Sequence, residues 1–410
     1  MIRLRACRLP GRPGLQELIL QKGRIAAIQV DAASTPDRRG VDLSAQGRLV
    51  TPGLIDVHTH GTGGAEVFSG SAADLQRMAL TLAQQGVTAF LATTICHRPT
   101  AHAHLRNAAD FISRQSKGGA RCLGIHLEGP YISVKRRGGI DPASIDSPAT
   151  QSLDELLEIC AGSLRMMTLA PELPGHLELV EQLVRHQVIP SLGHTDASYA
   201  QAFAGFKAGI QHATHLFNAM PPLLHRAPGC VAAVFTHPTV TAQIISDGVH
   251  VHPEIVNLTY RLLGAERCVL ITDGMQASGL PDGRYVYADK EYETRNGTAR
   301  YLDGTLIGST LSLIEMTLRF RKCAGCSLEV ALQCASRNPA RVLGLADRKG
   351  AILPGYDADL VVWNDDFSVY ATLINGEVVY RRGGPASDGR QGGNSEDKND
   401  PVIHGSGCGL

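Results

Sequence analysis

Two histidines at the end of an apolar run could bind a metal ion together. Residues 51–60 read Thr-Pro-Gly-Leu-Ile-Asp-Val-His-Thr-His, and glycines follow. Side chains two residues apart on a strand point to the same side, so His58 and His60 would leave the strand next to each other. Two surface histidines at a turn would give the same pattern, and this motif by itself leaves both interpretations open.

Further polar residues follow other apolar runs. They are Glu128 in HLEGP, His194 in SLGH, His215 in ATHLFNAM and Asp273 in LITDG. In barrel enzymes, functional side chains lie at the carboxyl ends of the strands. Histidine and carboxylate ligands suit zinc or another borderline divalent ion. Five candidate ligands and an aspartate, each placed after an apolar strand, are more than chance would supply, so we predict a metal centre.

The elements that must position these residues alternate between strand and helix. One predicted helix begins near Ser71 and ends at Gly86, and another covers Tyr199–Ala208 before Gly209. Predicted strands cover residues 54–57, 87–92, 122–127, 166–169, 188–192, 213–215, 241–245 and 268–271. Strands that alternate with helices over about 300 residues are typical of an α/β fold, and here they predict a (β/α)8 TIM-like barrel.

Both ends of the sequence read as strands. Leu15–Leu20 and Arg24–Val30 flank a short turn, and Asn375-Gly376 is a hairpin signal near the other end. We expect these segments to pair into a small β-sandwich domain. The predicted domains are residues 1–50 plus 350–382 for the sandwich, 51–349 for the catalytic barrel, and 383–410 for a tail expected to be disordered because it has little to bury.

Composition excludes several other classes of protein. The 410 residues carry no net charge, and the basic residues are scattered, which disfavours nucleic acid or a membrane surface as partner. No apolar run approaches the roughly 18 residues of a membrane span, and the N-terminus lacks a secretory apolar core. The ten cysteines are spread out; only Cys323 and Cys326 have metal or redox spacing, without a second pair. We expect a cytoplasmic protein.

The motifs resemble those of the amidohydrolase superfamily and, within it, the N-acetylglucosamine-6-phosphate deacetylase family. The resemblance covers about residues 15–380 and runs through TPGLIDVHTHG, LGIHLEGPYI, TLAPE, SLGHT, THLFNAM, ISDGVHVHP, ITDGM and DGTLIGSTLSLIE. His-x-His marks only the superfamily, whereas HLEGP and THLFNAM are typical of the deacetylases.

This resemblance implies roles for individual residues. Glu128, His194 and His215 match the family's metal ligands, and Asp273 matches its catalytic acid/base. Some members lack the first two histidines and hold one ion; His58 and His60 are present here, which implies a second ion with Glu128 as a bridge. Residues at positions that match the substrate site are Gly139, Ile140, Asn218, Ala219, Arg226, Asp247, His250, Leu306, Ile307 and Gly308.

The implied reaction is hydrolysis of the N-acetyl group of N-acetylglucosamine 6-phosphate to glucosamine 6-phosphate and acetate. A metal would polarise the amide and activate water, with Asp273 as base and then acid. Zinc is expected first, with iron, manganese or cobalt as alternatives. Arg226 offers a fork for the phosphate, helped by His225 or His250. Whether Arg226 serves its own subunit or the partner in an expected homodimer stays open.

One position departs from the family pattern. Members usually carry a histidine in a segment resembling K-K-G-x-H, whereas residues 135–140 read Lys-Arg-Arg-Gly-Gly-Ile. Ile140 cannot donate a hydrogen bond, so we expect a lower rate, a changed sugar preference, or replacement by His97 or His126. By strand period His126 faces the same way as Glu128, where it could support the ligands or pack in the core.

Three alternatives remain open. The first is a deacetylase for N-acetylgalactosamine 6-phosphate or another N-acyl amino sugar. The second is a scaffold without activity, which the complete set of candidate ligands disfavours. The third is a cyclic-amide hydrolase of the same superfamily; those commonly use a carbamylated lysine where Glu128 stands here.

Overall fold

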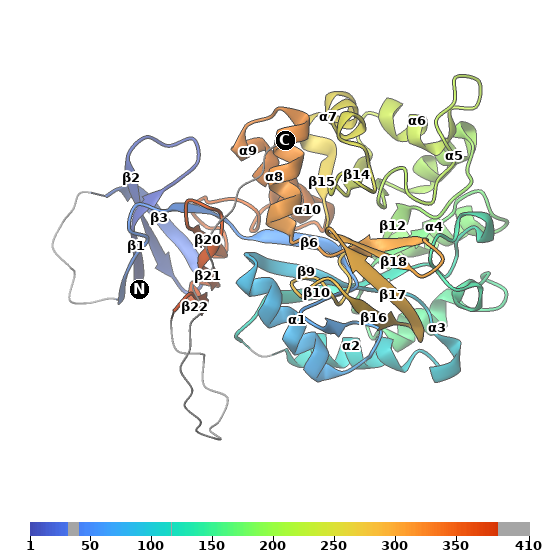
Figure 1. Cartoon of the computed structure of the whole chain (residues 1–410), viewed down its shortest axis with the longest axis horizontal. Helices are drawn as coiled ribbons and strands as arrows, with labels where there is room; N and C mark the ends of the chain where they lie inside the picture. Colours follow the sequence, from blue (N-terminus) through green and yellow to red (C-terminus); the bar gives the residue numbers. More distant parts are fainter. Residues whose placement is uncertain (32–40, 116, 384–410) are drawn as a thin grey trace, which may run out of the picture.

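The computed structural model describes residues 1–31, 41–115 and 117–383, and the segment predicted to be disordered lies outside them from residue 384 onward. A parallel sheet of eight strands forms the larger part of the molecule (Figure 1). In chain order its strands are β6 (Leu54–Thr59), β9 (Val87–Thr94), β10 (Arg121–Glu128), β11 (Leu164–Leu169), β12 (Ile189–Leu192), β13 (His212–Ala213), β14 (Thr241–Ile244) and β15 (Cys268–Leu270). The predicted barrel fold is confirmed.

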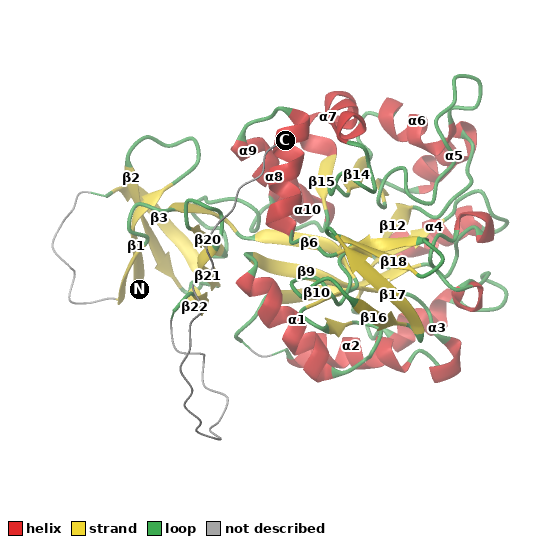
Figure 2. Ribbon diagram, in the orientation of Figure 1, coloured by secondary structure: helices red, strands yellow, loops and turns green. Residues whose placement is uncertain are grey.

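Helices surround this sheet (Figure 2). They are α1 (Ala72–Gln84), α2 (Ala103–Arg114), α3 (Leu153–Ile159), α4 (His176–Arg185), α5 (Tyr199–Ala208), α6 (Gly229–Thr236), α7 (Pro253–Arg267), α8 (Leu313–Ala324), α9 (Leu328–Ala335) and α10 (Arg337–Val342), with short 3-10 turns at Arg98–Thr100, Val134–Arg136 and Pro142–Ser144. The Ser71 side chain accepts a hydrogen bond from the Asp74 amide and caps α1 as predicted, and Ser198 and Gln201 form a capping box at the start of α5. Leu75, Met78 and Leu82 then form the buried face of α1.

The barrel closes between its first and last strands through single contacts rather than a continuous ladder in the described chain. The Asp273 amide donates to the His58 carbonyl over 3.0 Å, and Thr59 bridges Gly274. Below them the buried carboxylate of Asp56 accepts from the Thr272 hydroxyl over 2.6 Å and from the His58 amide over 3.2 Å. This seam therefore fixes the two strands that end in His58 and Asp273.

Strands from both ends of the chain form one small sheet beside the barrel, blue and red in Figure 1. Its order is β22-β21-β20-β5-β1-β2-β3, with β4 on β1. The bounds are β1 (Ile2–Arg8), β2 (Leu15–Gln21), β3 (Arg24–Val30), β4 (Val41–Ser44), β5 (Leu49–Pro52), β20 (Leu360–Trp363), β21 (Val369–Ile374) and β22 (Glu377–Arg381). The sheet has its own apolar core, which includes Leu18, Leu20 and Leu373. Trp363 packs into the apolar core of the barrel, and the Thr372 hydroxyl of β21 donates to the Ala83 carbonyl of α1 over 2.7 Å, so both residues join the small sheet to the barrel.

An antiparallel sheet is inserted between β15 and α8, and it was not predicted. It consists of β16 (Arg284–Tyr287), β17 (Lys290–Arg295), β18 (Thr298–Tyr301) and β19 (Leu306–Ser309). Its last strand returns to the barrel, where the Ser309 amide donates to the Asp273 carbonyl over 2.9 Å. Figure 1 shows these strands lying across the barrel strands. A small pair, β7 (Gly61–Thr62) and β8 (Ala65–Glu66), follows His60.

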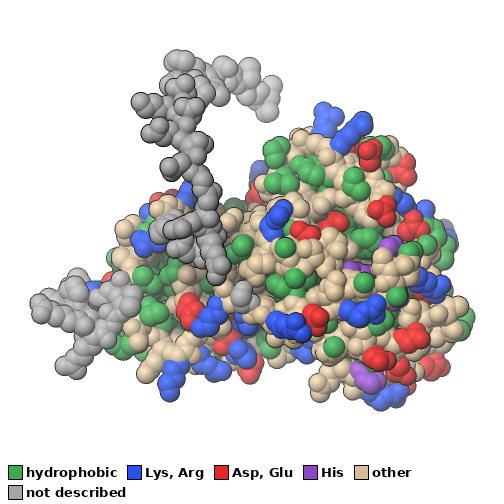
Figure 3. Space-filling view, turned by 90° about the horizontal axis from the view of Figure 1, so that it is seen from below, with side chains coloured by type: hydrophobic (Ala, Val, Ile, Leu, Met, Phe, Trp, Pro, Cys, Tyr) green, Lys and Arg blue, Asp and Glu red, His purple; other side chains and the backbone are tan. Residues whose placement is uncertain are grey.

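None of the helices in the described ranges combines the length and the apolar character needed to cross a bilayer. On the face seen in Figure 3, basic and acidic side chains are interspersed. Nine cysteines fall within the described residues, and all nine are free thiols.

Candidate metal centre and active site

Two groups of buried side chains meet at the carboxyl ends of the barrel strands. His58, His60 and Asp273 form the first group, and Glu128, His194 and His215 form the second. In each group the potential ligand atoms lie within 4.8 Å of one another. All of the predicted metal-binding residues and the predicted catalytic aspartate thus come together, although up to 215 residues separate them in sequence.

The first group lies at the seam of the barrel. Nε2 of His58 is 3.3 Å from Nε2 of His60, and both nitrogens lie near Oδ1 of Asp273, at 3.3 and 3.4 Å. His58 and His60 alternate along β6 as predicted, so their rings project to the same side. Asp273 reaches them from the other side of the seam.

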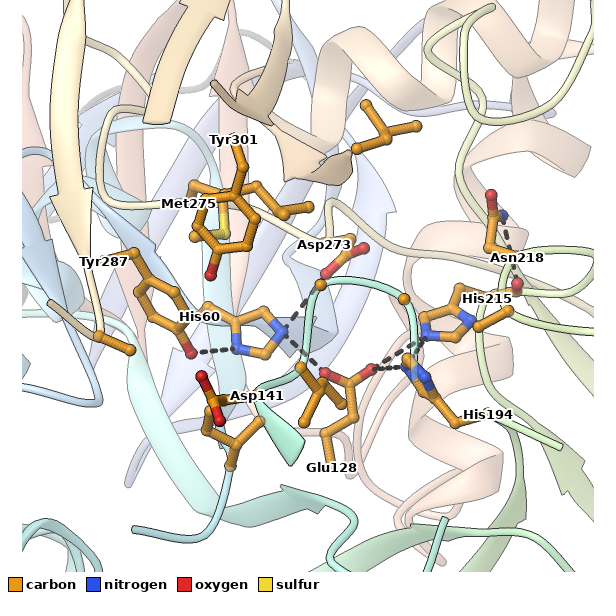
Figure 4. Close-up of a pocket in the computed structure, with 18 of the residues that line it drawn as sticks. His60, Glu128, Asp141, His194, His215, Asn218, Asp273, Met275, Tyr287 and Tyr301 are labelled. Carbon is orange, nitrogen blue, oxygen red and sulfur yellow. Dashed lines mark hydrogen bonds and ion pairs between the residues drawn. The ribbon is translucent and has the colours of Figure 1, made fainter. Parts of the chain in front are cut away.

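The second group is centred on Glu128, at the end of β10. Its Oε1 is 3.2 Å from Nε2 of His194 and 3.0 Å from Nε2 of His215. Its Oε2 faces the first group and lies 3.3 Å from Nε2 of His60. Oε1 also lies 3.5 Å from Nε2 of His58, so this one carboxylate contacts both groups; Figure 4 shows its contacts with His60, His194 and His215.

These distances fit a metal site. A tetrahedral ion with ligands about 2.0–2.1 Å away holds its ligand atoms about 3.3–3.4 Å apart. The Nε2 atoms face each other at 3.1–3.3 Å, and two Nε2 atoms that both lack a proton cannot form a hydrogen bond with each other. The donor set, four imidazoles and two carboxylates, suits a borderline divalent cation.

Neighbouring groups orient three of the histidines from behind. Nδ1 of His58 is 2.9 Å from the side-chain oxygen of Gln243, and Nδ1 of His194 is 2.8 Å from the Arg136 carbonyl. Nδ1 of His60 is 3.3 Å from the Tyr287 hydroxyl. Acceptors behind Nδ1 hold the proton there and leave Nε2 free for a metal.

Burial and mutual charge set the protonation of the site. Burial would raise the pKa of Asp273 and of Glu128, but the adjacent histidines outweigh it and hold both values well below the usual range. Burial would lower the pKa of His60, yet hydrogen bonds to Asp273 and Glu128 raise it to about 10. Without a cation, protons therefore balance the two carboxylates.

Three of the site residues have backbone conformations that side chains rarely adopt. The φ angles of His194, His215 and Asp273 are 46°, 27° and 46°. Such strain, about 1–3 kcal/mol each, persists where the surrounding structure enforces it and is common at functional sites. It also explains one difference from prediction: β13 ends at Ala213, and the chain turns so that His215 reaches Glu128 from beyond the strand.

A cavity of about 240 Å³ opens above the two groups. We call its lower side the floor, formed by His60, Glu128, His194, His215 and Asp273, and its upper side the roof, formed by Tyr287, Lys290, Tyr301, Leu306 and Ile307 of the inserted sheet. Figure 4 shows Tyr287 and Tyr301 directed into the cavity on the side of His60. His58 is completely buried beneath the floor.

Most of the predicted substrate residues line this cavity. They are Gly139, Ile140, Asn218, Ala219, His250, Leu306 and Ile307. Gly139 must lack a side chain, since a Cβ there would lie 2.6 Å from Ile307. Asp247 stands behind the lining and holds His250, with 2.6 Å between its Oδ2 and Nδ1. Gly308 packs against the backbone of Asp273.

Arg226 lies elsewhere. It is exposed in the loop before α6, next to the exposed Leu223 and Leu224. Among the residues that line the cavity there is no arginine. The structure thus brings together all the predicted site residues except this one, within a single chain.

Ile140 belongs to an apolar wall of the cavity. It is buried with Ile95 and Ile132 in a cluster against which Phe68 packs. Neither histidine suggested as its replacement lines the cavity. His126 is buried beside His58, with its Nε2 2.8 Å from the Thr168 hydroxyl, and the His97 ring packs at a tilt against Phe68.

Sequence reasoning missed the polar residues of the roof and its neighbour Asp141. Lys290 pairs with Asp141 over 2.6 Å, which links the inserted sheet to the loop that carries Ile140. The dipeptide Asn296-Gly297, a strong hairpin signal, could have revealed two of these strands.

Comparison with known proteins agrees with this geometry. Residues 49–379 match the amidohydrolase family. The chain is 36% identical to the N-acetylglucosamine-6-phosphate deacetylase of Bacillus subtilis, over 88% of this chain and 92% of that protein. It is 35% identical to the N-acetylgalactosamine-6-phosphate deacetylase of Escherichia coli O157:H7, over 92% and 98%.

The fold of this chain is similar to that of a solved structure over nearly the whole length of both proteins. It is an aspartate-to-alanine mutant of the N-acetylglucosamine-6-phosphate deacetylase from Mycobacterium smegmatis in complex with N-acetylglucosamine 6-phosphate. The TM-score is 0.82 at 32% identity, and the match covers 92% of this chain and 99% of that one.

Proposed function

Because the chain belongs to the amidohydrolase family, and is therefore a hydrolase, we propose that it removes the acetyl group of N-acetylglucosamine 6-phosphate. The products are glucosamine 6-phosphate and acetate. The observation that carries this proposal is the convergence of five candidate metal ligands and Asp273 at the base of one cavity, which all of them except His58 line. The matched relatives with this activity support the choice of substrate.

A divalent cation held by these residues would polarise the amide carbonyl of the substrate and lower the pKa of a bound water molecule. Asp273 is the base: its carboxylate lines the cavity, and its low pKa means that it starts without a proton. It takes the proton of the attacking water and then gives it to the amine, which cannot leave as an anion. The left-handed backbone at Asp273 holds this carboxylate toward the floor.

We further propose two zinc ions per subunit, with iron, manganese or cobalt as alternatives. His58 and His60 would hold one ion with Asp273, and His194 and His215 the other. Glu128 would bridge them, in keeping with the contacts of its carboxylate with histidines of both groups. The barrel, residues 51–349, would be the catalytic domain and the paired ends, 1–50 and 350–382, a small supporting domain.

The sugar phosphate would lie along Asn218, Ala219 and His250, with Gly139, Ile140 and Leu306–Gly308 around the sugar. Asp247 supports this arrangement because its carboxylate orients His250. A phosphate also calls for an arginine fork, and Arg226 is exposed outside its own cavity. We therefore place Arg226 in the cavity of a second subunit.

A homodimer of this kind has a candidate surface. Ile255, Leu258 and Leu262 are each 37–46% exposed and follow helical spacing on one face of α7. Leu223 and Leu224 of the Arg226 loop are about half exposed as well. Burial of such apolar side chains favours association. Free cysteines throughout the described residues are in keeping with a cytoplasmic location.

The test is release of acetate by the zinc-loaded protein from each of the two hexosamine 6-phosphate epimers. We expect turnover of the glucosamine derivative, with Asp273→Asn as the inactive control. The galactosamine epimer is the second candidate, since a relative named for it is nearly as similar. If neither epimer is hydrolysed faster by the wild type than by the variant, the proposed function is wrong.

A further inference from the structure

Tyr287 joins the roof of the cavity to its floor. It is buried at the end of β16 and lines the cavity, and its hydroxyl oxygen is 3.3 Å from Nδ1 of His60. Phe68 and His60 pack around its ring, with ring centres 5.7 and 6.0 Å away. These contacts hold the phenol in place, so its hydroxyl has one fixed position.

The direction of the hydrogen bond to His60 follows from the other nitrogen of that ring. Nε2 of His60 faces Glu128 and Asp273, at 3.3 and 3.4 Å. A metal bound at Nε2 leaves the proton of the ring on Nδ1. Nδ1 then donates, and the Tyr287 oxygen accepts.

The hydroxyl proton of Tyr287 is then left without a protein acceptor. A phenol keeps its proton at neutral pH and can therefore act as a donor. Within the described part of the chain the Tyr287 hydroxyl makes no hydrogen bond other than that to His60. An unmet donor in a closed site is costly, and the cavity is where a bound molecule can supply the acceptor.

We propose that Tyr287 donates a hydrogen bond to the acetamide carbonyl oxygen of the substrate; this inference rests on the proposed function. The amide must lie against the floor for hydrolysis, and the Tyr287 hydroxyl is next to the floor residue His60. The carbonyl oxygen gains negative charge as water attacks, so a fixed donor there stabilises the transition state more than the ground state. Ile140 cannot supply such a donor, and neither His97 nor His126 reaches the cavity.

The first experiment compares Tyr287→Phe with Tyr285→Phe. Both tyrosines belong to β16, but the Tyr285 hydroxyl donates to the Pro281 carbonyl and is exposed. We expect Tyr287→Phe to lower kcat/KM by about ten- to hundredfold, because the variant lacks a donor that acts in the transition state. Tyr285→Phe should change it by less than about twofold. Equal effects of the two substitutions would overturn the inference.

The second experiment separates substrate contact from orientation of His60. In protein that already carries Asp273→Asn, calorimetry gives the Kd of the intact substrate and of the product glucosamine 6-phosphate, which has no carbonyl. Adding Tyr287→Phe should weaken the substrate about tenfold and leave the product and the metal content unchanged. Equal weakening of both ligands, or a loss of metal, would show that Tyr287 only orients His60 and does not contact the substrate, which would overturn the proposal. Absence of turnover by the wild type would instead defeat the proposed function.

Discussion

The floor and the roof of the cavity are built in different ways. The floor collects charged and imidazole side chains from five strands of the barrel, and its residues are held by several partners each. The roof comes from one inserted segment, and it offers aromatic and aliphatic side chains with a single lysine. The floor can activate water and amide, whereas the roof can shape the space above them.

This difference predicts that substitutions in the floor and in the roof change different kinetic parameters. Changes in the floor should act on metal content and kcat. Changes in the roof and in the walls that touch it should act mainly on KM and on the choice between substrates. Tyr287 is the exception, because it touches both parts.

Removal of metal should have the largest effect. Chelation should abolish activity, and zinc should restore it, while the roof stays folded. At free zinc a thousandfold above its Kd, the bound form should be about 4 kcal/mol more stable. Measurement of Tm and acetate release with and without chelator checks this; full activity after verified metal removal would break the distinction between the two sides.

The stabilisation by metal should also depend on pH. The raised pKa of His60, about 10, means that its proton stabilises the metal-free fold below the unfolded value of roughly 6.5, and that this contribution is lost as pH rises toward 10. The metal replaces that proton. The difference in Tm between zinc-loaded and metal-free protein should therefore widen between pH 6.5 and 9, and a constant difference would contradict this.

The substitution Asp273→Asn should have the next largest effect on activity. The amide cannot accept the proton of water, so kcat should fall by about 10²–10⁴, with KM changed by less than about threefold. Steady-state measurement of kcat and KM for the variant and the wild type checks this prediction. A change confined to KM would show that this floor residue binds rather than reacts.

Ile140→His tests the wall between floor and roof. The imidazole would enter the cluster of Ile95, Ile132 and Phe68, at a cost of about 1–3 kcal/mol for a polar group without a prepared partner. We expect a lower Tm and a KM ratio between the two hexosamine epimers that shifts by several-fold. Ile140→Leu is the control, and an equal shift with leucine would exclude hydrogen bonding as the cause.

Lys290→Met should have the smallest effect. The pair that Lys290 forms with Asp141 is about 40% exposed on both sides, and such pairs contribute about 0–1 kcal/mol. We expect a rise in KM of no more than about threefold, with kcat and metal content unchanged. A fall in kcat alone would remove the distinction between roof and floor.

The sequence predicted the floor well because its residues obey local rules. His58 and His60 follow the two-residue period of a strand, and Glu128, His194 and Asp273 follow apolar runs that the barrel topology brings to one end. The left-handed backbone of His194 and His215 could not be predicted, because it is imposed by the packing of the whole site and not by residues such as Gly or Asn.

The roof was harder to predict. Asn296-Gly297 marked a hairpin, but nothing in the sequence says that this hairpin folds over the barrel. The contact between Tyr287 and His60 joins residues 227 positions apart, and it exists only because the inserted sheet returns to the same seam. The position of Arg226 outside the cavity likewise depends on a loop that local sequence rules do not orient.

The way this inserted sheet is attached bears on how such enzymes diversify. It leaves the barrel after Asp273 and rejoins it at Ser309, and the two points are hydrogen-bonded neighbours. A segment whose ends adjoin can be exchanged, lengthened or shortened without moving the place where the barrel resumes. A lineage could in this way acquire a new sugar preference by replacing one contiguous stretch, while it inherits the hydrolytic machinery intact.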